Sequence, residues 1–453
     1  MLSYVLGPWR CRTAKLGNAV KRVVFFCCFV CLPVHAFAQA PLLWELQEDI
    51  NGGVDFARAI SLSGRAAVIV GNGGVPLQGG NESDLVIQAL SRTTGAIKWS
   101  DETFLSIGSV EPLFVATRKN TAYVAGTLRE PNDLRSAILV RAYDVPTGAL
   151  LWQNVWHAGQ GIDTDHPTGI FATPTVVLVT GYSENATRDG LASVIRAYDR
   201  LNGNVLWEDR SGSTATDVIG LTIAATRNRV FLAGTISPTS NSSLRDLFVR
   251  ALDAATGAVV WEVTRQSTIP ARLLVQSGLV IVGGSAAANT FLGAFSAATG
   301  IVVWQDMAPT AGADADIAVS GFRIAAAINS GSQFAVRVLD MRNGILQWQE
   351  RSAAGAGFHE HALAVGINSD AVFIAGNSGQ DFGNSQFLVQ AYDAATGNLL
   401  WDDRSHASPQ TTAVDLAVGK FRLFVAGSTT NSATGTDFLI RVYDLRPNTT
   451  ATH

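Results

Sequence analysis

Cysteine is missing from almost the whole chain. The 453 residues contain four cysteines, and all of them lie in the first 31 positions, at Cys11, Cys27, Cys28 and Cys31. A fold built from the remaining residues therefore has no disulfide available to it, even in an oxidising compartment. Its stability must come from burial of apolar surface, which a chain of this length can supply.

Charge is also sparse, and basic residues are not concentrated anywhere in the main part of the chain. Charged residues make up 15% of the sequence, with 33 Lys and Arg against 37 Asp and Glu. Residues 1–38 hold five of the basic residues and none of the acids, so the rest has 28 basic and 37 acidic side chains, a formal charge of −9. This balance disfavours nucleic acids and anionic membrane surfaces as partners.

Apolar runs long enough to cross a membrane are likewise lacking. The stretch VVFFCCFVCLPV at 23–34 is too short to span a bilayer, so we do not expect an integral membrane protein. It follows a basic segment and precedes Ala-Phe-Ala at 36–38, a pattern typical of signal-peptidase cleavage. Residues 1–38 are therefore predicted to be a Sec-type signal peptide, which makes the mature protein periplasmic or secreted.

Helical periodicity is absent from the rest of the chain, and short strand-like runs take its place. Residues 361–401 show the unit: HALAV, VFIAGN, QFLVQAYD and GNLLW are apolar or alternating runs separated by Gly, Asn, Ser and Asp. Runs of this kind bounded by turn residues are typical of β-strands. Each unit is therefore predicted to be a four-stranded antiparallel meander, with strands A to D.

The unit recurs, and a tryptophan marks each copy. Successive tryptophans are 55, 53, 55, 54, 43, 44 and 53 residues apart. They are Trp44, Trp99, Trp152, Trp207, Trp261, Trp304, Trp348 and Trp401. A fixed period in this range indicates a solenoid, an array or a propeller. Because a large ring recurs at one place in strand D, we interpret these tryptophans as structural wedges that dock neighbouring blades.

The turn before each tryptophan repeats as well. An Asp ends strand C in RAYDVPTGALLW (141–152) and RALDAATGAVVW (250–261), where its carboxylate is expected to accept hydrogen bonds from the following backbone amides. The Gly that follows, such as Gly148 and Gly257, suits a tight hairpin position with positive φ.

Seven complete motifs and one divided motif predict an eight-bladed, all-β propeller. RVYDLRPN (441–448) ends the chain without a tryptophan, and PLLWELQ (41–47) has a tryptophan without a preceding turn. The N-terminal strand is therefore expected to complete the last blade, since radial closure leaves only short edges. The predicted domain spans 39–446, followed by a tail at 447–453, and we expect a monomer.

The consensus YDxxTGxxxW resembles the tryptophan-docking repeat of the pyrroloquinoline-quinone-like β-propellers. That family includes quinoprotein alcohol dehydrogenases and the non-enzymatic propeller subunit of the bacterial outer-membrane barrel-assembly machinery. SDLVIQAL (83–90) and TDFLIRVYD (436–444) are also similar to related bacterial propeller repeats without a redox function. The resemblance spans residues 40–446 and implies the fold far more specifically than an activity.

Two classes of function follow from this resemblance. The first is a non-catalytic binding scaffold without a cofactor, which the absence of recognisable catalytic motifs favours. The second is a dehydrogenase that uses pyrroloquinoline quinone with Ca²⁺. That family of enzymes carries a vicinal cysteine pair against the quinone, and the mature chain has no cysteine. A propeller hydrolase or lyase using His166 or His361 remains a third alternative.

The loops suggest where a partner would bind. The A–B and C–D turns share one face of a propeller, and the B–C loops and D–A connections share the other. The B–C loops are long and variable, except that the fifth and sixth repeats are about ten residues shorter. Variable loops on a rigid scaffold commonly carry function, so this face is predicted to bind a protein, peptide or glycan.

Acidic and histidine side chains gather in the D–A connections, which lead into the innermost strand. They are predicted to ring the central channel and to hold a hard cation or a polar ligand. The ligand-binding candidates are Asp55, Glu111, Asp165, His166, Asp217, His359, Glu360 and His361. Asp163, Asp314, Asp316 and Asp415 lie in equivalent segments. The alternative is that these are ordinary polar residues of exposed connections, without a ligand.

Overall fold

The computed structural model describes fifteen stretches of the chain. They are 38–39, 41–50, 52–77, 80–103, 109–129, 136–157, 165–184, 190–213, 215–287, 289–309, 315–352, 357–380, 384–404, 410–431 and 433–446. The chain divides into two compact units, Met1–Ala36 and Phe37–His453, and the architecture below is that of the second. The predicted signal peptide lies outside the described residues apart from Ala38.

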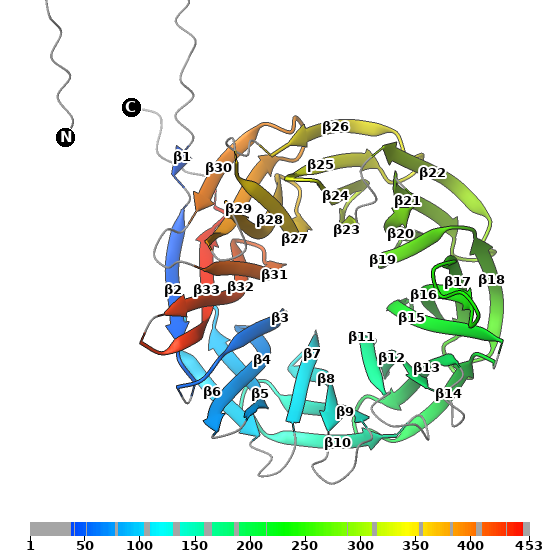
Figure 1. Ribbon diagram of the computed structural model, residues 1–453, viewed down its shortest axis with the longest axis horizontal. Helices are drawn as coiled ribbons and strands as arrows, with labels where there is room; N and C mark the ends of the chain where they lie inside the picture. The colour runs from blue at the N-terminus through cyan, green and yellow to red at the C-terminus, as the bar shows by residue number, and fades with distance from the viewer. Residues whose placement is uncertain are drawn as a thin grey trace, which may run out of the picture. The chain divides into compact units, whose positions relative to one another are not determined.

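Eight antiparallel sheets account for the described residues, which confirms the predicted fold. Each sheet is a blade, and Figure 1 shows the blades arranged in sequence order around a central opening. No helix occurs in the described part of the chain, and hence none with the length and apolar character needed to cross a membrane.

Every blade contains four strands, A to D, from the centre outward. Blade 1 has β3 (Phe56–Ser63), β4 (Ala66–Leu77), β5 (Gly80–Ser91) and β6 (Ile97–Thr103). Blade 2 has β7 (Ser109–Arg118), β8 (Thr121–Arg129), β9 (Ser136–Asp144) and β10 (Leu150–Trp156). Blade 3 has β11 (His166–Ala172), β12 (Val176–Glu184), β13 (Leu191–Asp199) and β14 (Val205–Ser211). Blade 4 has β15 (Thr216–Ala225), β16 (Arg229–Pro238), β17 (Asp246–Asp253) and β18 (Val259–Arg265).

The second half of the ring repeats this order. Blade 5 has β19 (Thr268–Gln276), β20 (Leu279–Ala286), β21 (Asn289–Ser296) and β22 (Val302–Pro309). Blade 6 has β23 (Ala315–Ser320), β24 (Arg323–Ser330), β25 (Gln333–Asp340) and β26 (Leu346–Arg351). Blade 7 has β27 (His359–Ile367), β28 (Ala371–Gly379), β29 (Ser385–Asp393) and β30 (Leu399–Arg404), with β1 (Ala38–Gln39) added outside β30. Blade 8 has β31 (Thr411–Val418), β32 (Arg422–Asn431), β33 (Gly435–Asp444) and β2 (Leu42–Glu48).

The last blade is completed by the N-terminal strand, as the divided motif predicts. β2 pairs antiparallel with β33, with Leu42 opposite Tyr443 and Trp44 opposite Val442. The ring is thus closed by hydrogen bonds between segments almost 400 residues apart in sequence. Closure of this kind removes the two open faces that the first and last sheets would otherwise expose to water.

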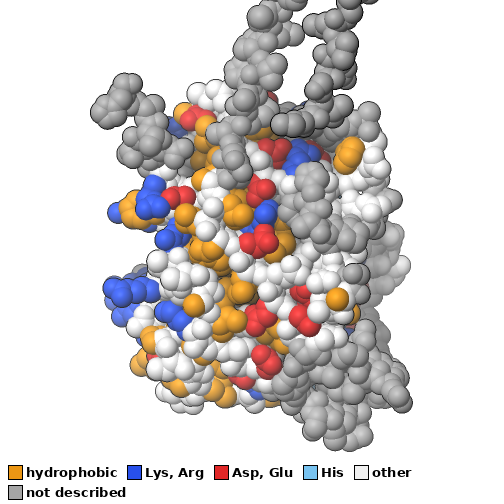
Figure 2. All heavy atoms as spheres, turned by 90° about the vertical axis from the view of Figure 1, so that its left-hand side faces the viewer, with side chains coloured by type: hydrophobic (Ala, Val, Ile, Leu, Met, Phe, Trp, Pro, Cys, Tyr) orange, Lys and Arg blue, Asp and Glu red, His pale blue; other side chains and the backbone are white. Residues whose placement is uncertain are grey.

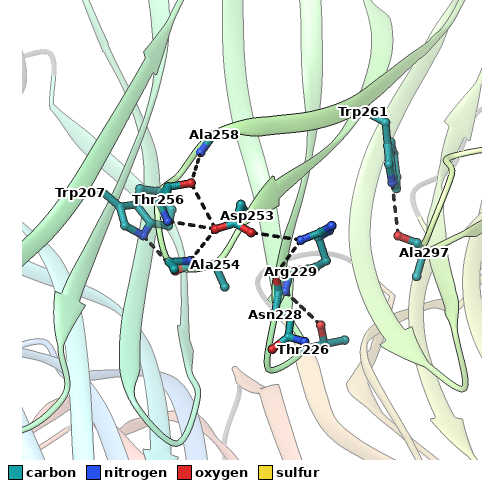
Figure 3. Close-up of polar contacts among 11 residues, drawn as sticks. Trp207, Thr226, Asn228, Arg229, Asp253, Ala254, Thr256, Ala258, Trp261 and Ala297 are labelled. Carbon is teal, nitrogen blue, oxygen red and sulfur yellow. Dashed lines mark hydrogen bonds and ion pairs between the residues drawn. The ribbon is translucent and has the colours of Figure 1, made fainter.

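The C–D turn has the chemistry expected from its sequence. In blade 4, Asp253 Oδ1 accepts hydrogen bonds from the backbone amides of Ala255 and Thr256, both at 3.1 Å, and the second is drawn in Figure 3. Gly257 follows with φ of +74°, a left-handed conformation that side chains with a Cβ rarely adopt. The Asp253 side chain therefore stabilises the turn, which reverses the chain so that strand D pairs antiparallel with strand C.

Each described tryptophan of blades 1 to 6 contacts the turn of the following blade. The Nε1 of Trp207 donates to the carbonyl of Ala254 at 3.0 Å, and Trp261 donates in the same way to Ala297 (Figure 3). The ring of Trp207 covers the turn so closely that a Cβ on Gly257 would lie 2.6 Å from it. The turn glycine therefore serves two needs, positive φ and space for the neighbouring ring.

Arginines of strand C add a polar contact between blades. Arg250 on β17 pairs with Glu262 of its own blade at 2.5 Å and with Asp209 of the preceding blade at 3.2 Å. Arg441 on β33 makes the same two contacts, with Glu45 at 2.6 Å and Asp403 at 2.8 Å. Arg250 and Arg441, each three residues before the turn Asp, thus link the outer strands of two neighbouring blades beside the tryptophan contact.

Candidate functional site

The innermost strands of all eight blades surround a central channel of about 550 Å³. Figure 1 shows the opening between β3, β7, β11, β15, β19, β23, β27 and β31. Most of the lining side chains are aliphatic, as in Ile60, Val115 and Leu274. Four lining residues carry charge, namely Arg58, Arg272, Asp316 and Asp415. Among the described residues, these four define the polar chemistry of the channel.

Three of the four charged residues occupy one equivalent position of strand A. Strand pairing places Arg272 opposite Gly283, Asp316 opposite Ala327 and Asp415 opposite Ala426. In blades 5 and 8 a β-bulge precedes this position. A bulge re-aims the side chains beside it, which is why they are common near functional sites and at rims.

These channel side chains also hold neighbouring blades together. Asp415 Oδ2 of blade 8 accepts a hydrogen bond from the amide of Ile60 in blade 1 at 2.8 Å. Asp316 Oδ2 of blade 6 accepts one from Val365 in blade 7 at 2.9 Å. The Nε of Arg272 lies 3.7 Å from a carboxylate oxygen of Asp316, and the positive charge of Arg272 also attracts Asp415. The two carboxylates are therefore engaged in structural contacts.

Burial in the channel wall raises the pKa of Asp415 to about 6, although the Ile60 amide and Arg272 oppose the shift. Burial also raises the pKa of Asp316, against the attraction of Arg272. Raised carboxyl pKa values are common at functional sites, but they also occur in structural networks. Here both acids bridge adjacent innermost strands, which accounts for their burial.

A pH-dependent stability follows from the raised pKa of Asp415. The unfolded carboxyl has a pKa near 3.9, so the stabilising contribution of Asp415 is fully present below about pH 4 and lost as pH rises through 6. We expect the difference in unfolding free energy between the wild type and Asp415→Asn, measured by urea denaturation, to fall between pH 4 and 7. A difference that stays constant over that window would contradict this assignment.

Asp253→Asn is the matched control for that measurement. The Ala255 amide and the Thr256 hydroxyl hold the pKa of Asp253 below its ordinary value. Stability contributed by this carboxylate is present above the unfolded pKa and lost only as pH falls through the lower folded pKa. The difference in unfolding free energy between the wild type and Asp253→Asn should therefore stay constant from pH 5 to 7.

Three of the acids predicted to ring the channel are buried at the entry to strand A. Asp55, Asp165 and Glu360 have exposed fractions of 0%, 1% and 0%. The three acids occupy equivalent positions in their blades. The residue that follows each acid pairs with Asn72, Tyr182 and Asn377, respectively, on strand B. They lie in three different blades and do not form a common site.

Each of these buried acids has its own surroundings. Asp55 accepts hydrogen bonds from the amides of Ile50 at 2.5 Å and Gly74 at 3.2 Å. Glu360 pairs with Arg404 at 2.5 Å, and Arg404 also pairs with Asp402 at 2.8 Å. Glu360 thus belongs to a polar network inside blade 7.

The remaining sequence-predicted residues are more exposed and are dispersed. Glu111 pairs with Arg58 at 3.2 Å at the channel mouth. Asp217 accepts a hydrogen bond from the amide of Leu191 at 2.7 Å. His166 lies 3.4 Å from Thr127 Oγ1 and packs against the Tyr182 ring. His359 is exposed and His361 is half-buried on β27. Their roles in binding a ligand stay predictions.

Sequence reasoning missed two acids that the fold brings to Asp55. One oxygen each of Asp49, Asp55 and Asp437 lies within 4.8 Å of the others. Asp437 was hidden inside a strand run, TDFLIRVYD, almost 400 residues from Asp55. Closure of the ring by β2 brings these segments together. The divided motif, which predicts that closure, is therefore the sequence signal that could have indicated their proximity.

The channel does not fit pyrroloquinoline quinone with Ca²⁺. The aromatic residues of the described lining are Phe114 and Phe171, without a tryptophan, and the chain has no cysteine beyond Cys31 from which a disulfide wall could form. A Ca²⁺ ion would need several free oxygens. Asp316 and Asp415 lie beside Arg272, whose positive charge opposes the binding of a cation there.

The outer wall carries an unexpected apolar feature. A β-bulge precedes the tryptophan of every strand D, and the two side chains before it are exposed in each blade except blade 7, where Leu399 is half-buried. The exposed apolar residues at these positions are Leu42, Leu43, Ile97, Leu150, Leu151, Val205, Leu206, Val259, Val260, Val302, Val303, Leu346 and Leu400. We call this set the apolar rim. Figure 2 shows hydrophobic side chains along this outer wall. Recurring exposed apolar surface commonly marks an interaction site.

These features define an eight-bladed β-propeller with tryptophan-docked blades. Residues 191–420 match the family model described as outer membrane protein assembly factor BamB. The match spans half of the chain, and the chain belongs to this family of propellers with pyrroloquinoline-quinone-like repeats. The resemblance inferred from the YDxxTGxxxW repeats is thereby confirmed.

Solved structures share the architecture at low identity. BamB from Moraxella catarrhalis is 13% identical, with a TM-score of 0.54 over 89% of this chain and 99% of that chain. A quinohemoprotein alcohol dehydrogenase from Pseudomonas putida HK5 is 13% identical, with a TM-score of 0.54 over 91% and 78% of the two chains. The computationally designed Ika8 protein is 15% identical, with a TM-score of 0.57 over 88% and 100%. No curated protein sequence matches the chain significantly. These likenesses show the fold alone.

Proposed function

We propose that the protein is an exported, non-catalytic binding scaffold, and that it holds an extended segment of a partner protein along the outer edge of its blades. The apolar rim beside the open edge of strand D is the observation that supports this most strongly. The family model is described as an outer membrane protein assembly factor, and a role in the assembly of other proteins agrees with the proposal. The predicted signal peptide and this family together favour the periplasm.

The outer edge of strand D offers unpaired backbone groups. Strand D is the last strand of its sheet in blades 1 to 6 and 8, so one side of its backbone has no neighbouring strand. Such edges accept added strands, a mode in which main-chain hydrogen bonds supply affinity and side-chain contacts supply selectivity. In blade 7 that position is already filled, because β1 pairs parallel with β30.

The pairing of β1 with β30 shows which part of the strand D edge can accept an added strand. Ala38 lies opposite Trp401 and Gln39 opposite Asp402, directly after the bulge at Leu400. A bulge interrupts pairing at its own position, so an added strand is expected to run from the tryptophan onward. The exposed pair before the tryptophan then lies at the end of the added strand and can pack against its side chains.

The binding face predicted from the sequence, formed by the B–C loops and D–A connections, is a different surface from the apolar rim. Parts of this face lie outside the described residues, notably 130–135 and 185–189 of the B–C loops and 104–108, 158–164, 310–314, 353–356 and 405–409 of the D–A connections. The B–C hairpins of blades 5 and 6 are short, since Ala286 pairs with Asn289 and Ser330 with Gln333. A role for the long-loop face therefore stays a prediction, whereas the rim is described in every blade.

Binding of a defined strand-forming peptide tests the proposal. The probe is an immobilised eight-residue peptide of alternating Val and Thr, and the variant carries Glu at Leu151, Leu206, Val260, Val303 and Leu400. Burying one such side chain contributes about 1.5–3 kcal/mol, so we expect the variant to bind at least about tenfold more weakly in surface plasmon resonance. N-methylation of the peptide at alternate residues should abolish binding, because it removes the backbone donors.

The control changes exposed apolar residues on the turn face. Phe322 and Phe421 are 55% and 50% exposed and lie in A–B turns, between β23 and β24 and between β31 and β32. Replacing them with Ser should leave peptide binding unchanged. Equal binding by the rim variant and the wild type would overturn the proposal. Dye reduction with an alcohol, added pyrroloquinoline quinone and Ca²⁺ would overturn its non-catalytic part.

A further inference from the structure

Three carboxylates meet where the first and last blades join. Asp49 and Asp55 lie in the connection from β2 to β3, and Asp437 lies on β33. The backbone of this connection is fixed to β33, because the amide of Asp55 donates to the carbonyl of Thr436 at 2.6 Å and Val54 bridges to Thr436. One oxygen from each acid lies within 4.8 Å of the other two. We call this group the closure cluster.

An acidic cluster alone would not indicate a ligand, but Asp437 adds a separate observation. Asp437 is 2% exposed. Its Oδ2 accepts hydrogen bonds from Gln47 at 2.6 Å and Thr434 at 3.0 Å, whereas its Oδ1 has no hydrogen-bond partner among the described residues. A buried carboxylate oxygen without a donor is strongly unfavourable unless a cation satisfies it.

The charge of the closure cluster is not balanced by any basic side chain. None of its three acids forms an ion pair within the described part of the chain. Three carboxylates this close need a counter-charge to coexist as anions.

We propose that the closure cluster binds one Ca²⁺ ion, which joins the β2–β3 connection to β33 and so fastens the ring. All three ligands are carboxylate oxygens, the donors that hard cations prefer. Three oxygens within 4.8 Å of one another can all contact one Ca²⁺ ion at its usual oxygen distance of about 2.4 Å. The spread of the cluster therefore accommodates Ca²⁺. This site lies outside the channel and is independent of the proposed partner binding.

The site explains how a divided blade is held shut without a disulfide. Asp437 and Asp55 are separated by almost 400 residues, so an ion between them closes a very long loop. Cross-links that close long loops remove much conformational freedom from the unfolded chain. A ligand that binds only the folded state also raises its stability in proportion to the logarithm of its concentration over Kd.

Calorimetric titration and thermal unfolding of the full chain test this site. After treatment with EDTA, the wild type should bind one equivalent of CaCl₂ and melt several degrees higher with saturating Ca²⁺ than without it. Asp437→Asn should weaken Ca²⁺ binding at least tenfold and lose the shift. Without Ca²⁺ the variant should melt at or above the temperature of the wild type, because it removes a charge repulsion and nearly preserves shape.

The control is Asp246→Asn, a carboxylate on β17 of blade 4 that accepts a hydrogen bond from the Ser267 amide but lies outside the closure cluster. It should retain the full Ca²⁺ response. Absence of heat and of a melting shift in the wild type would overturn the proposal, as would unchanged Ca²⁺ binding by Asp437→Asn. An equal response to MgCl₂ at the same concentration would overturn the assignment to Ca²⁺.

Discussion

Trp207→Ala is expected to lower the free energy of unfolding by about 3–5 kcal/mol, the range for removing a large buried aromatic side chain. Trp207 is 8% exposed, donates a hydrogen bond to Ala254 and covers Gly257 of the next blade. The substitution removes contacts on both sides of a blade interface and leaves the Ala254 carbonyl without its donor. Urea denaturation followed by tryptophan fluorescence measures the change.

Leu206→Ala provides the control on the same strand. Leu206 precedes Trp207 in sequence but is 50% exposed, because the bulge directs it to solvent. Its removal should change the free energy of unfolding by less than about 0.5 kcal/mol, as for most surface substitutions. Similar effects of the two substitutions would contradict the assignment of the tryptophans to blade docking.

Arg404→Met is expected to destabilise the fold by about 3–5 kcal/mol, because it leaves a buried charge without its partner. Glu360 has an exposed fraction of 0%, and Arg404 pairs with both Glu360 and Asp402. Burial raises the pKa of Asp402, and the nearby Arg404 opposes this shift. Without the guanidinium, two acids of blade 7 would share a buried site without a counter-charge.

The double variant Glu360→Gln with Arg404→Met separates loss of charge pairing from loss of packing. Replacing both partners of a buried pair is commonly far less harmful than removing one. We therefore expect the double variant to recover most of the lost stability in urea denaturation. A double variant as unstable as Arg404→Met alone would show that packing of the Arg404 stem, and not the ion pair, maintains this part of blade 7.

The architecture could be predicted from the sequence because its determinants are local and repeated. The Asp, Gly and tryptophan of each copy stand at nearly fixed offsets, and each has a local physical role in a turn or on a strand. The closing strand could also be predicted, since Trp44 lacks a turn and RVYDLRPN lacks a tryptophan. Repetition multiplies a signal that one copy alone would leave ambiguous.

The candidate site could be predicted only in part, because strand pairing decides it. Their position at the start of strand A placed Asp55, Asp165 and Glu360 near the centre, but pairing at the bulge determines which side chains reach the channel. Asp415 and Arg272 face it, whereas Glu360 is directed into its blade. The proximity of Asp49 and Asp55 to Asp437 follows from ring closure, which the divided motif predicts, but nothing in the motif itself marks these three acids.

The apolar rim could not be predicted from the sequence, for a related reason. ALLW and NVLW read as ordinary apolar strand ends in which alternate residues face inward. The bulge before each tryptophan breaks that alternation, so both residues of the pair are exposed. A register shift of this kind depends on the paired strand and is not visible in a single run of residues.

Hydrogen exchange of the wild type with and without the Val-Thr peptide tests the proposed scaffold function most directly. Amide protons on the open outer edge of strand D exchange with solvent in the free protein and become hydrogen-bonded when a strand is added. The account predicts that the peptide slows exchange in outer strands from the tryptophan onward, for example at 207–211 of β14. Slowing confined to the innermost strands of the channel, or to the long-loop face, would contradict it.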